Sequence, residues 1–242
     1  MANHFLDVGI VLDEYDHLDD LKALVGGNKG EYIEVNGKKY FLVKIDDRIE
    51  LWFKTEDGEV NLATLEPHYR TDKYIEIMGA EWVEMDDSGM SGLLRGVLPL
   101  YPLNFNIPNA AMVPELQQDK IYACQAACFA ESMEIYEDIE DFEENCEYGE
   151  GFNPQSVIST GCWNSWGADD VLQTSRAVIS GIVKNVEEKE NSYSNVKYYV
   201  ITIESQGCEF DLLAAEDFIE KTPAAGNIVM GRFWLSGKII SR

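Results

Sequence analysis

Basic residues are scarce in this chain. Lysine and arginine together number 19, against 44 aspartates and glutamates, and the formal net charge at pH 7 is −25. Such a charge repels phosphate groups, so the composition disfavours direct binding of nucleic acid. The chain also lacks an apolar run close to the roughly 20 residues that a membrane-spanning helix needs, and its N-terminus shows no secretion signal. We therefore expect a cytoplasmic protein that binds neither nucleic acid nor membrane.

Cysteine is too sparse for a disulfide framework. The chain has 5 cysteines, an odd number, which in a cytoplasmic protein predicts reduced thiols. Four of them lie from Cys124 to Cys162, but only Cys124 and Cys128 form a close pair, whereas zinc sites usually have two such pairs. Small buried side chains are the simpler interpretation. We expect five free thiols, no bound metal and no cofactor.

The motifs of the common enzyme classes are also missing. The sequence has no G-x-S-x-G, no Walker loop, no G-x-G-x-x-G and no H-E-x-x-H. Among the 3 histidines, His68 has the neighbours best suited to acid–base chemistry, Glu66 and Tyr69. These three residues are the catalytic candidates. The alternative is that His68 closes a turn by hydrogen bonding.

What the chain does have is a series of strand patterns. Asn36-Gly37 predicts a hairpin between the apolar runs 32–35 and 40–45. Glu56-Asp57-Gly58 predicts another between 49–53 and 60–65. Further strands are expected at 5–12, 74–78, 81–85, 93–98 and 103–107, the last as an edge strand between prolines. One helix is expected at 13–25, ending at Gly26-Gly27.

The stretch 121–136 suits two structures. Its alanines favour a helix, whereas the alternation of apolar with polar or small residues favours a strand. We expect a long strand here, followed by a short helix from Ile139 to about Asn145. Another strand region is expected from Phe152 to Trp163. The prolines from Pro99 to Pro114 mark the best candidate for a domain boundary.

The last 67 residues have the pattern of a small barrel. Strands are expected at 177–186, 196–203, 208–213, 228–235 and 237–240, with a polar break from Glu187 to Asn195, a turn at Gln206-Gly207 and a short helical turn at 214–221. This order resembles the OB-fold, a five-stranded partly open barrel that often serves oligonucleotides. Because the module has aromatic residues but few basic ones, we interpret it as a scaffold.

The predicted fold class is α+β, predominantly antiparallel β. Three parts are predicted: residues 1–114 as an N-terminal sheet unit with short helices, 115–174 as a central acidic segment, and 175–242 as an OB-like module. No clear internal repeat is visible in the sequence.

Acidic residues gather in the central segment. Between Lys120 and Arg176 there is no lysine or arginine but there are twelve acids. Such a run is usually a solvated face, and its spacing lacks the calcium loop pattern. The alternative is a docking face for a basic protein, because complementary charge speeds encounter. The residues predicted to bind this partner are Glu134, Glu137, Asp138, Glu140, Asp141, Glu143 and Glu144.

Trp163-Asn-Ser-Trp166 places two aromatic residues three apart. They suit either an aromatic lip for a sugar or peptide, or core filling at a domain junction, which we favour.

A resemblance adds to these patterns. The ending Gly231-Arg-Phe-Trp-Leu-Ser-Gly237, the segment Ile49-Glu-Leu-Trp-Phe53 and the alanine-rich strand followed by acids are together similar to bacterial proteins without an assigned activity. The resemblance implies a bacterial cytoplasmic origin and supplies no catalytic residues. The predicted function is non-enzymatic binding of a basic protein through the acidic surface. The alternative is an enzyme or small-molecule binder with a cleft between the N-terminal sheet and the C-terminal barrel.

Overall fold

The computed structural model describes residues 4–12, 17–27, 30–99, 101–147, 152–162, 173–219 and 221–240. Its strands form two sheets. The small sheet contains β1 (Gly30–Val35), β2 (Lys38–Lys44), β3 (Ile49–Glu56) and β4 (Glu59–Tyr69). The 9-stranded sheet contains β5 (Ile75–Met85), β6 (Gly92–Val97), β7 (Pro102–Ile107), β8 (Tyr122–Tyr136), β9 (Ser156–Ser159), β10 (Arg176–Glu190), β11 (Lys197–Ser205), β12 (Cys208–Ala215) and β13 (Ile228–Ile240).

The described helical elements are few and short. They are the α-helices α1 (His17–Gly27) and α2 (Ile139–Asn145) and the 3-10 turns η1 (Leu6–Val8), η2 (Ala110–Met112) and η3 (Glu216–Phe218). The prediction of a mainly β protein with short helices is confirmed. The helix predicted after Ile139 and the long strand predicted at 121–136 are also present, as α2 and β8. Of the helix predicted at 13–25, residues 13–16 lie outside the described residues, and α1 runs from His17 through Gly26 to Gly27, beyond the predicted stop.

Turn chemistry explains the hairpins. Asn36 and Gly37 have φ angles of 53° and 75°, and Gln206 and Gly207 have 52° and 74°. Positive φ at both central residues is what a two-residue turn needs to match the twist of its strands. Both predicted turns are therefore confirmed, as is the hairpin around Asp57-Gly58.

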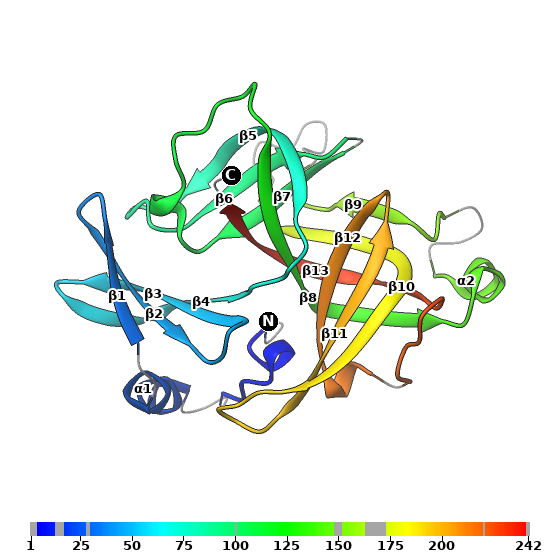
Figure 1. Ribbon diagram of the computed structural model, residues 1–242, viewed down its shortest axis with the longest axis horizontal. Helices are drawn as coiled ribbons and strands as arrows, with labels where there is room; N and C mark the ends of the chain where they lie inside the picture. Colours follow the sequence, from blue (N-terminus) through cyan, green and yellow to red (C-terminus); the bar gives the residue numbers. More distant parts are fainter. Residues whose placement is uncertain are drawn as a thin grey trace.

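The pairings of the large sheet close on themselves twice. In the first ring β5 pairs with β6, β6 with β7, β7 with β13, β13 with β8, and β8 again with β5. In the second ring β10, β11, β12, β8 and β13 pair in that order, and β13 returns to β10. The long strands β8 and β13 belong to both rings, and in Figure 1 they run between β5–β7 and β10–β12.

The two rings have the same internal order. Each half of the chain supplies three consecutive antiparallel strands, a 3-10 turn and one long strand. The third strand then pairs in parallel with the long strand of the other half. Asn106 of β7 pairs with Ser236 of β13, and Leu213 of β12 pairs with Phe129 of β8. The long strand of each half therefore completes the ring of the other half.

The equivalence extends to polar side chains on the second and third strands. The Asn104 side-chain oxygen Oδ1 accepts a hydrogen bond from the half-buried Arg95 Nε, and the buried Asp211 carboxylate accepts one from Thr202 Oγ1, at 3.4 and 2.7 Å. In both rings the donor lies on the second strand, directly opposite an acceptor on the third. The sequence does not reveal this repeat, because the side chains differ while the backbone pairing is the same.

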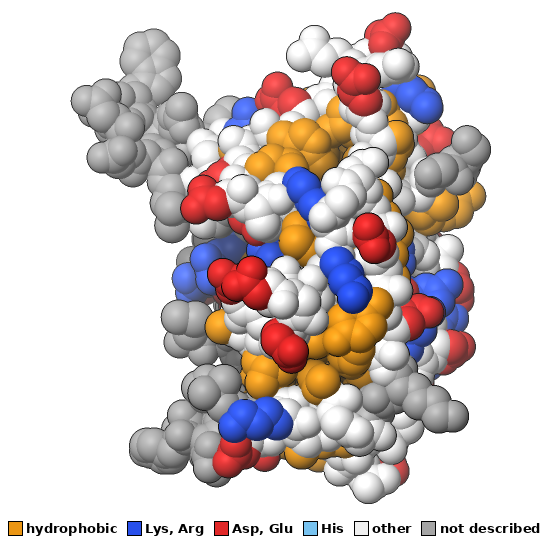
Figure 2. All heavy atoms as spheres, turned by 90° about the vertical axis from the view of Figure 1, so that its left-hand side faces the viewer, with side chains coloured by type: hydrophobic (Ala, Val, Ile, Leu, Met, Phe, Trp, Pro, Cys, Tyr) orange, Lys and Arg blue, Asp and Glu red, His pale blue; other side chains and the backbone are white. Residues whose placement is uncertain are grey.

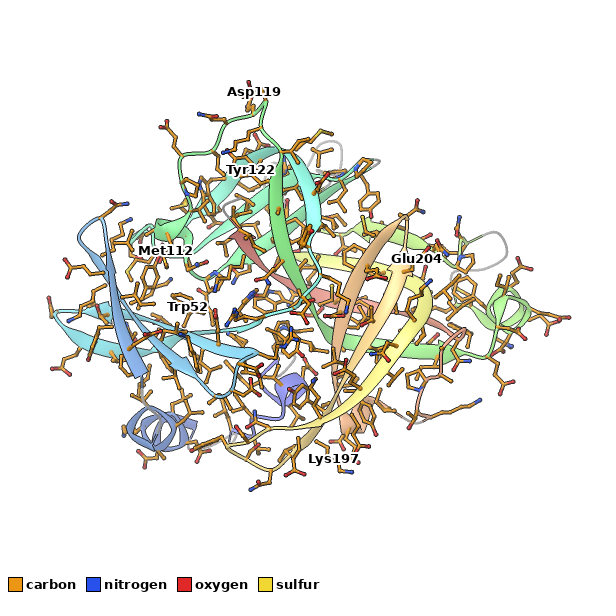
Figure 3. All side chains as sticks on the ribbon, in the orientation of Figure 1. Trp52, Met112, Asp119, Tyr122, Lys197 and Glu204 are labelled. Atoms are coloured by element: carbon orange, nitrogen blue, oxygen red, sulfur yellow. The ribbon has the colours of Figure 1, made fainter. Side chains whose placement is uncertain are left out.

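The small sheet is packed on both faces. One face shares a core cluster with the second ring, including Phe41 and Tyr198. The other face faces the first ring, where the Tyr40 hydroxyl donates to the Met90 carbonyl at 2.5 Å. Trp52, labelled in Figure 3, lies on this same side. The small sheet thus contacts both rings.

Two strand predictions are wrong. Residues 5–12 contain η1 instead of a strand: Gly9 ends the turn with φ 73°, and the Val8 carbonyl accepts from Asn191 Nδ2 at 2.7 Å. This side-chain bond satisfies the backbone without a partner strand. Strand β7 is not an edge strand, because β6 lies on one side of it and β13 on the other. Strand β10 also continues to Glu190, into the first part of the polar break predicted from Glu187 to Asn195.

The predicted domain limits do not follow the sheets. The large sheet takes strands from all three predicted parts, and β8, which precedes residue 175, contributes to both rings. Separate folding of residues 1–114, 115–174 and 175–242 therefore stays a prediction.

Candidate functional site

The predicted acidic face lies on α2 and the end of β8. Helix α2 is at one extreme of the molecule, on the right in Figure 1. Asp138 caps it by accepting a hydrogen bond from the Asp141 backbone N–H at 2.9 Å. On its inner side Phe142 is fully buried and makes an edge contact with Tyr136. These contacts hold the acids of α2 against the second ring.

The seven predicted acids have unequal surroundings. Six are exposed and Asp141 is half-buried. Glu137 forms an ion pair with Lys221 at 2.6 Å, and Asp141 accepts from the Glu137 backbone N–H at 2.7 Å. The hydrogen bond from the Glu137 N–H, followed by one from the Asn145 side chain, lowers the pKa of Asp141. Among the described residues only Glu137 of the seven has an ion-pair partner. Glu134, Asp138 and Asp141 accept hydrogen bonds, whereas Glu140, Glu143 and Glu144 have neither an ion pair nor a hydrogen-bond partner in the described structure.

An exposed apolar side chain lies among these acids. Ile139, the first residue of α2, is 50% exposed. On the side of the molecule away from α2, Figure 2 shows acidic residues interspersed with lysine, arginine and hydrophobic side chains. Adjacent exposed acids occur there too, at Glu56, Asp57 and Glu59 of the β3–β4 turn. The α2 face differs in gathering seven acids within residues 134–144 together with one exposed apolar residue. We call Ile139 and the seven acids the α2 face.

No hydrogen bond joins the three catalytic candidates to one another in the described structure. Glu66 is half-buried and accepts a hydrogen bond from Asn106 Nδ2 at 2.6 Å. Tyr69 is buried in the core cluster shared with the second ring, and burial raises its pKa. His68 is completely buried, and its Nδ1 lies 3.0 Å from Ser236 Oγ. Because Ser236 Oγ is also 3.2 Å from the Pro67 carbonyl, to which it donates, it accepts from Nδ1–H.

The surroundings of His68 keep it neutral. Burial, followed by the charges of Lys238 and Arg70, lowers its pKa to about 3. Its other ring nitrogen, Nε2, has no hydrogen-bond partner among the described residues. A neutral imidazole without access to solvent suits a structural role better than proton transfer.

This burial predicts a pH effect on stability. In the unfolded chain the histidine binds a proton below about pH 6.5, whereas the folded protein resists protonation down to about pH 3. Its contribution is therefore complete above about pH 6.5 and is lost as the pH falls, by about 1.4 kcal/mol per pH unit. We expect the wild type to lose about 2 to 3 kcal/mol more than His68→Gln between pH 7 and pH 4.5. Urea unfolding at each pH measures this difference, and equal pH dependences would contradict it.

An ion pair that the sequence analysis missed lies beside His68. Glu50, opposite His68 in the β3–β4 ladder, is buried, and Lys238 Nζ lies 2.9 and 3.1 Å from its two carboxylate oxygens. Arg70 Nε is 3.6 Å away, and Trp52 Nε1 donates to the carboxylate at 3.0 Å. The available signal was a charged residue within an apolar strand, at Ile49-Glu50-Leu51. The pair ties the small sheet to β13.

A hollow of about 630 Å³ lies between the two rings. Its volume is within the range of ligand sites, roughly 300 to 1,000 Å³. The described residues that line it come from the start of β5, the β6–β7 turn and the start of β12: Asp72, Lys73, Tyr74, Ile75, Glu76, Pro99, Gly207, Cys208 and Glu209. The hollow lies between the N-terminal and C-terminal parts of the chain, and its lining has no histidine or serine among these residues.

The five cysteine side chains form no disulfide and are buried or half-buried. All five cysteines are free; Cys124, Cys128 and Cys146 are buried, and Cys162 and Cys208 are half-buried. Burial raises the pKa of Cys124 to about 12. In the described part of the chain no three His, Cys, Asp or Glu side chains are grouped so that they could hold a metal ion. The predicted aromatic pair Trp163 and Trp166 lies outside the described residues.

No family model, no curated protein and no solved structure matches this chain. Of the helices that the structure describes, none has the length and apolar character needed to cross a membrane. The bacterial resemblance stays a prediction.

Proposed function

We propose that this protein is a non-enzymatic binding protein whose α2 face docks on a basic surface of a partner protein. The observation that carries the proposal is the grouping of Glu140, Glu143 and Glu144, which have no ion-pair partner in the described structure, beside the exposed Ile139. Adjacent like charges without counter-charges repel one another, so a basic surface would relieve a cost that the free protein carries.

The form of the face also suits docking. Phe142 fixes α2 against the ring end, so little order is lost when a partner binds. Ile139 supplies an apolar contact, and the acids near it in the chain supply orientation and a high rate of encounter. Charge attraction acts over about a Debye length, roughly 8 Å at physiological salt, so the association should weaken as salt is added.

We further propose that both rings are OB-like barrels. In support, each has an antiparallel three-strand meander whose third strand lies parallel to the closing strand, and a 3-10 turn before the fourth strand. In the C-terminal one the closing strand is β8, which precedes the meander in sequence. With a net charge of −25, this scaffold is proposed to act without nucleic acid, in the cytoplasm.

Neutralising the α2 face should abolish capture of the partner. The variant changes the seven acids to glutamine or asparagine, and immobilised wild type and variant are exposed to cell lysate at low and high salt. We expect the wild type to retain basic proteins at low salt and release them at high salt, because the attraction is screened. The variant should retain none of these proteins.

A matched control distinguishes the effect of the acids on the α2 face from the effect of the total charge of the protein. It neutralises seven exposed acids elsewhere, namely Asp19, Glu31, Glu34, Glu56, Asp57, Glu59 and Glu84. This control should capture the same basic proteins as the wild type. If the control and the α2 variant lose capture equally, or if both behave as the wild type does, the α2 face is a solvated surface only.

A second candidate function is binding of a ligand between the two parts of the chain. The specific observation in its favour is the hollow of about 630 Å³ between the rings. The lining offers acids, one lysine, a tyrosine and a thiol, and this set suits recognition better than a nucleophile–base pair, for which a base such as histidine is usually placed beside the nucleophile.

A further inference from the structure

Because the two rings have the same strand order, the hollow beside the first ring can be compared with the equivalent place in the second ring. The hollow is bounded by the start of β5, by the β6–β7 turn and by β12 of the other ring. The equivalent place in the second ring is bounded by the start of β10, by the β11–β12 turn and by β7. In that place the chain carries β9, which belongs to neither three-strand meander.

Strand β9 shows how such a place is filled. It pairs antiparallel with the first residues of β10, from Ala177 to Ser180. It lies against β7, and Gln206 of the β11–β12 turn donates its side-chain amide to the Gln155 carbonyl. Val157 of β9 is buried in the core cluster, while the next residue, Ile158, is largely exposed. A four-residue extended segment is therefore sufficient to occupy the position.

The pairing pattern leaves the same position available beside β5. In the second ring β10 pairs with β9 up to Ser180 and with β11 from Ile182 onward. In the first ring β6 pairs with β5 from Met78 onward. The hollow lies beside the residues of β5 that come before Met78, which is where a counterpart of β9 would lie.

The charged residues that line the hollow indicate which kind of peptide it would bind. Its lining has the carboxylates of Asp72, Glu76 and Glu209 and the amino group of Lys73. Asp72 forms an ion pair with Arg48, whereas Glu209 is exposed and forms no ion pair among the described residues. Lys73 Nζ lies 3.7 Å from the buried Asp211 carboxylate, so its charge is directed inward. Tyr74, which is 52% exposed, and Pro99 supply apolar surface within the hollow. An extended strand with one apolar side chain and flanking basic residues complements this lining.

We propose that the hollow binds a short extended peptide segment of a partner protein, about four residues long with basic flanks, in the way that β9 lies beside β10. This mode is β-strand addition, in which the backbone supplies affinity and the alternate side chains supply specificity. The proposal does not depend on the α2 face, since the two sites share no residue.

The test uses a labelled synthetic peptide with the sequence of residues 153–160 between two lysines at each end. Fluorescence anisotropy measures its binding to wild type, to Glu209→Lys in the hollow, and to Glu143→Lys on α2. We expect saturable binding to the wild type, about threefold to tenfold weaker binding to Glu209→Lys because one attractive charge becomes repulsive, and unchanged binding to Glu143→Lys. A peptide with glutamate ends should bind at least about tenfold more weakly.

A second measurement tests whether the peptide binds in the hollow. In a Cys162→Ser background the one half-buried thiol left is Cys208, which lines the hollow. The lysine-ended peptide should slow the reaction of Cys208 with a thiol reagent, and the glutamate-ended peptide should not. Absence of binding, equal binding to Glu209→Lys, equal binding of both peptides, or an unchanged thiol rate would each overturn the proposal. Sensitivity to Glu143→Lys alone would overturn it while supporting the α2 face.

Discussion

Phe233→Ala is expected to lower the free energy of unfolding by about 3 to 5 kcal/mol. Phe233 lies in β13, the strand that both rings share, and it is completely buried. Its neighbours on the adjoining strands are Ala130 of β8 and Ala177 of β10. Two small residues make room for the ring, and they cannot fill the space that its removal leaves.

Equilibrium unfolding in urea measures this loss, as a shift of the midpoint at constant slope. The control is Tyr193→Ala in the loop between β10 and β11, where the ring is largely exposed and a change within about 0.5 kcal/mol is expected. A loss below 1 kcal/mol for Phe233→Ala would mean that the shared strand is not tightly packed, and the two-ring arrangement would lose its main support.

Lys238→Met is expected to cost about 3 to 5 kcal/mol, because it leaves the buried Glu50 carboxylate without its nearest cation. Arg70 remains at 3.6 Å but is largely exposed, so it compensates only in part. The cost arises from desolvation of the carboxylate, since its attraction to the lysine no longer offsets its removal from water.

A second variant distinguishes this charge effect from lost packing. Glu50→Gln in the Lys238→Met background removes the unpaired charge but keeps an oxygen that can accept from Trp52 Nε1. We expect the double variant to be more stable than Lys238→Met alone by at least 1 to 2 kcal/mol. If the double variant is less stable than the single one, the cost lies in the lysine methylenes and not in the ion pair.

The buried pair also sets the position of the small sheet. Lys238 and Ser236, two residues apart on β13, contact Glu50 and His68, which lie opposite each other in the small sheet. Side chains two residues apart share a face of a strand, so these contacts fix one register between β13 and the small sheet. A shift by one residue would leave the buried Glu50 carboxylate without Lys238.

Local features of this protein could be predicted from its sequence. The turns at Asn36-Gly37 and Gln206-Gly207 follow from residues that tolerate positive φ. The choice of strand for β8 follows from the alternation of Ala127, Phe129, Met133 and Ile135 with polar or small residues. The grouping of acids on α2 follows from their spacing beside Phe142. In each case the interacting residues are close together in the chain, so the sequence order carries the information.

Only the tertiary structure decided which strands meet. The pairing of β8 with β13 joins residues such as Cys128 and Leu235, and alternation of side chains does not encode such a distant partner. The same holds for His68 and Glu50: the sequence shows two polar residues in strands, and their burial depends on β13 lying against them. The hollow beside β5 also depends on the tertiary structure, because its lining combines β5 of the first ring with β12 of the second.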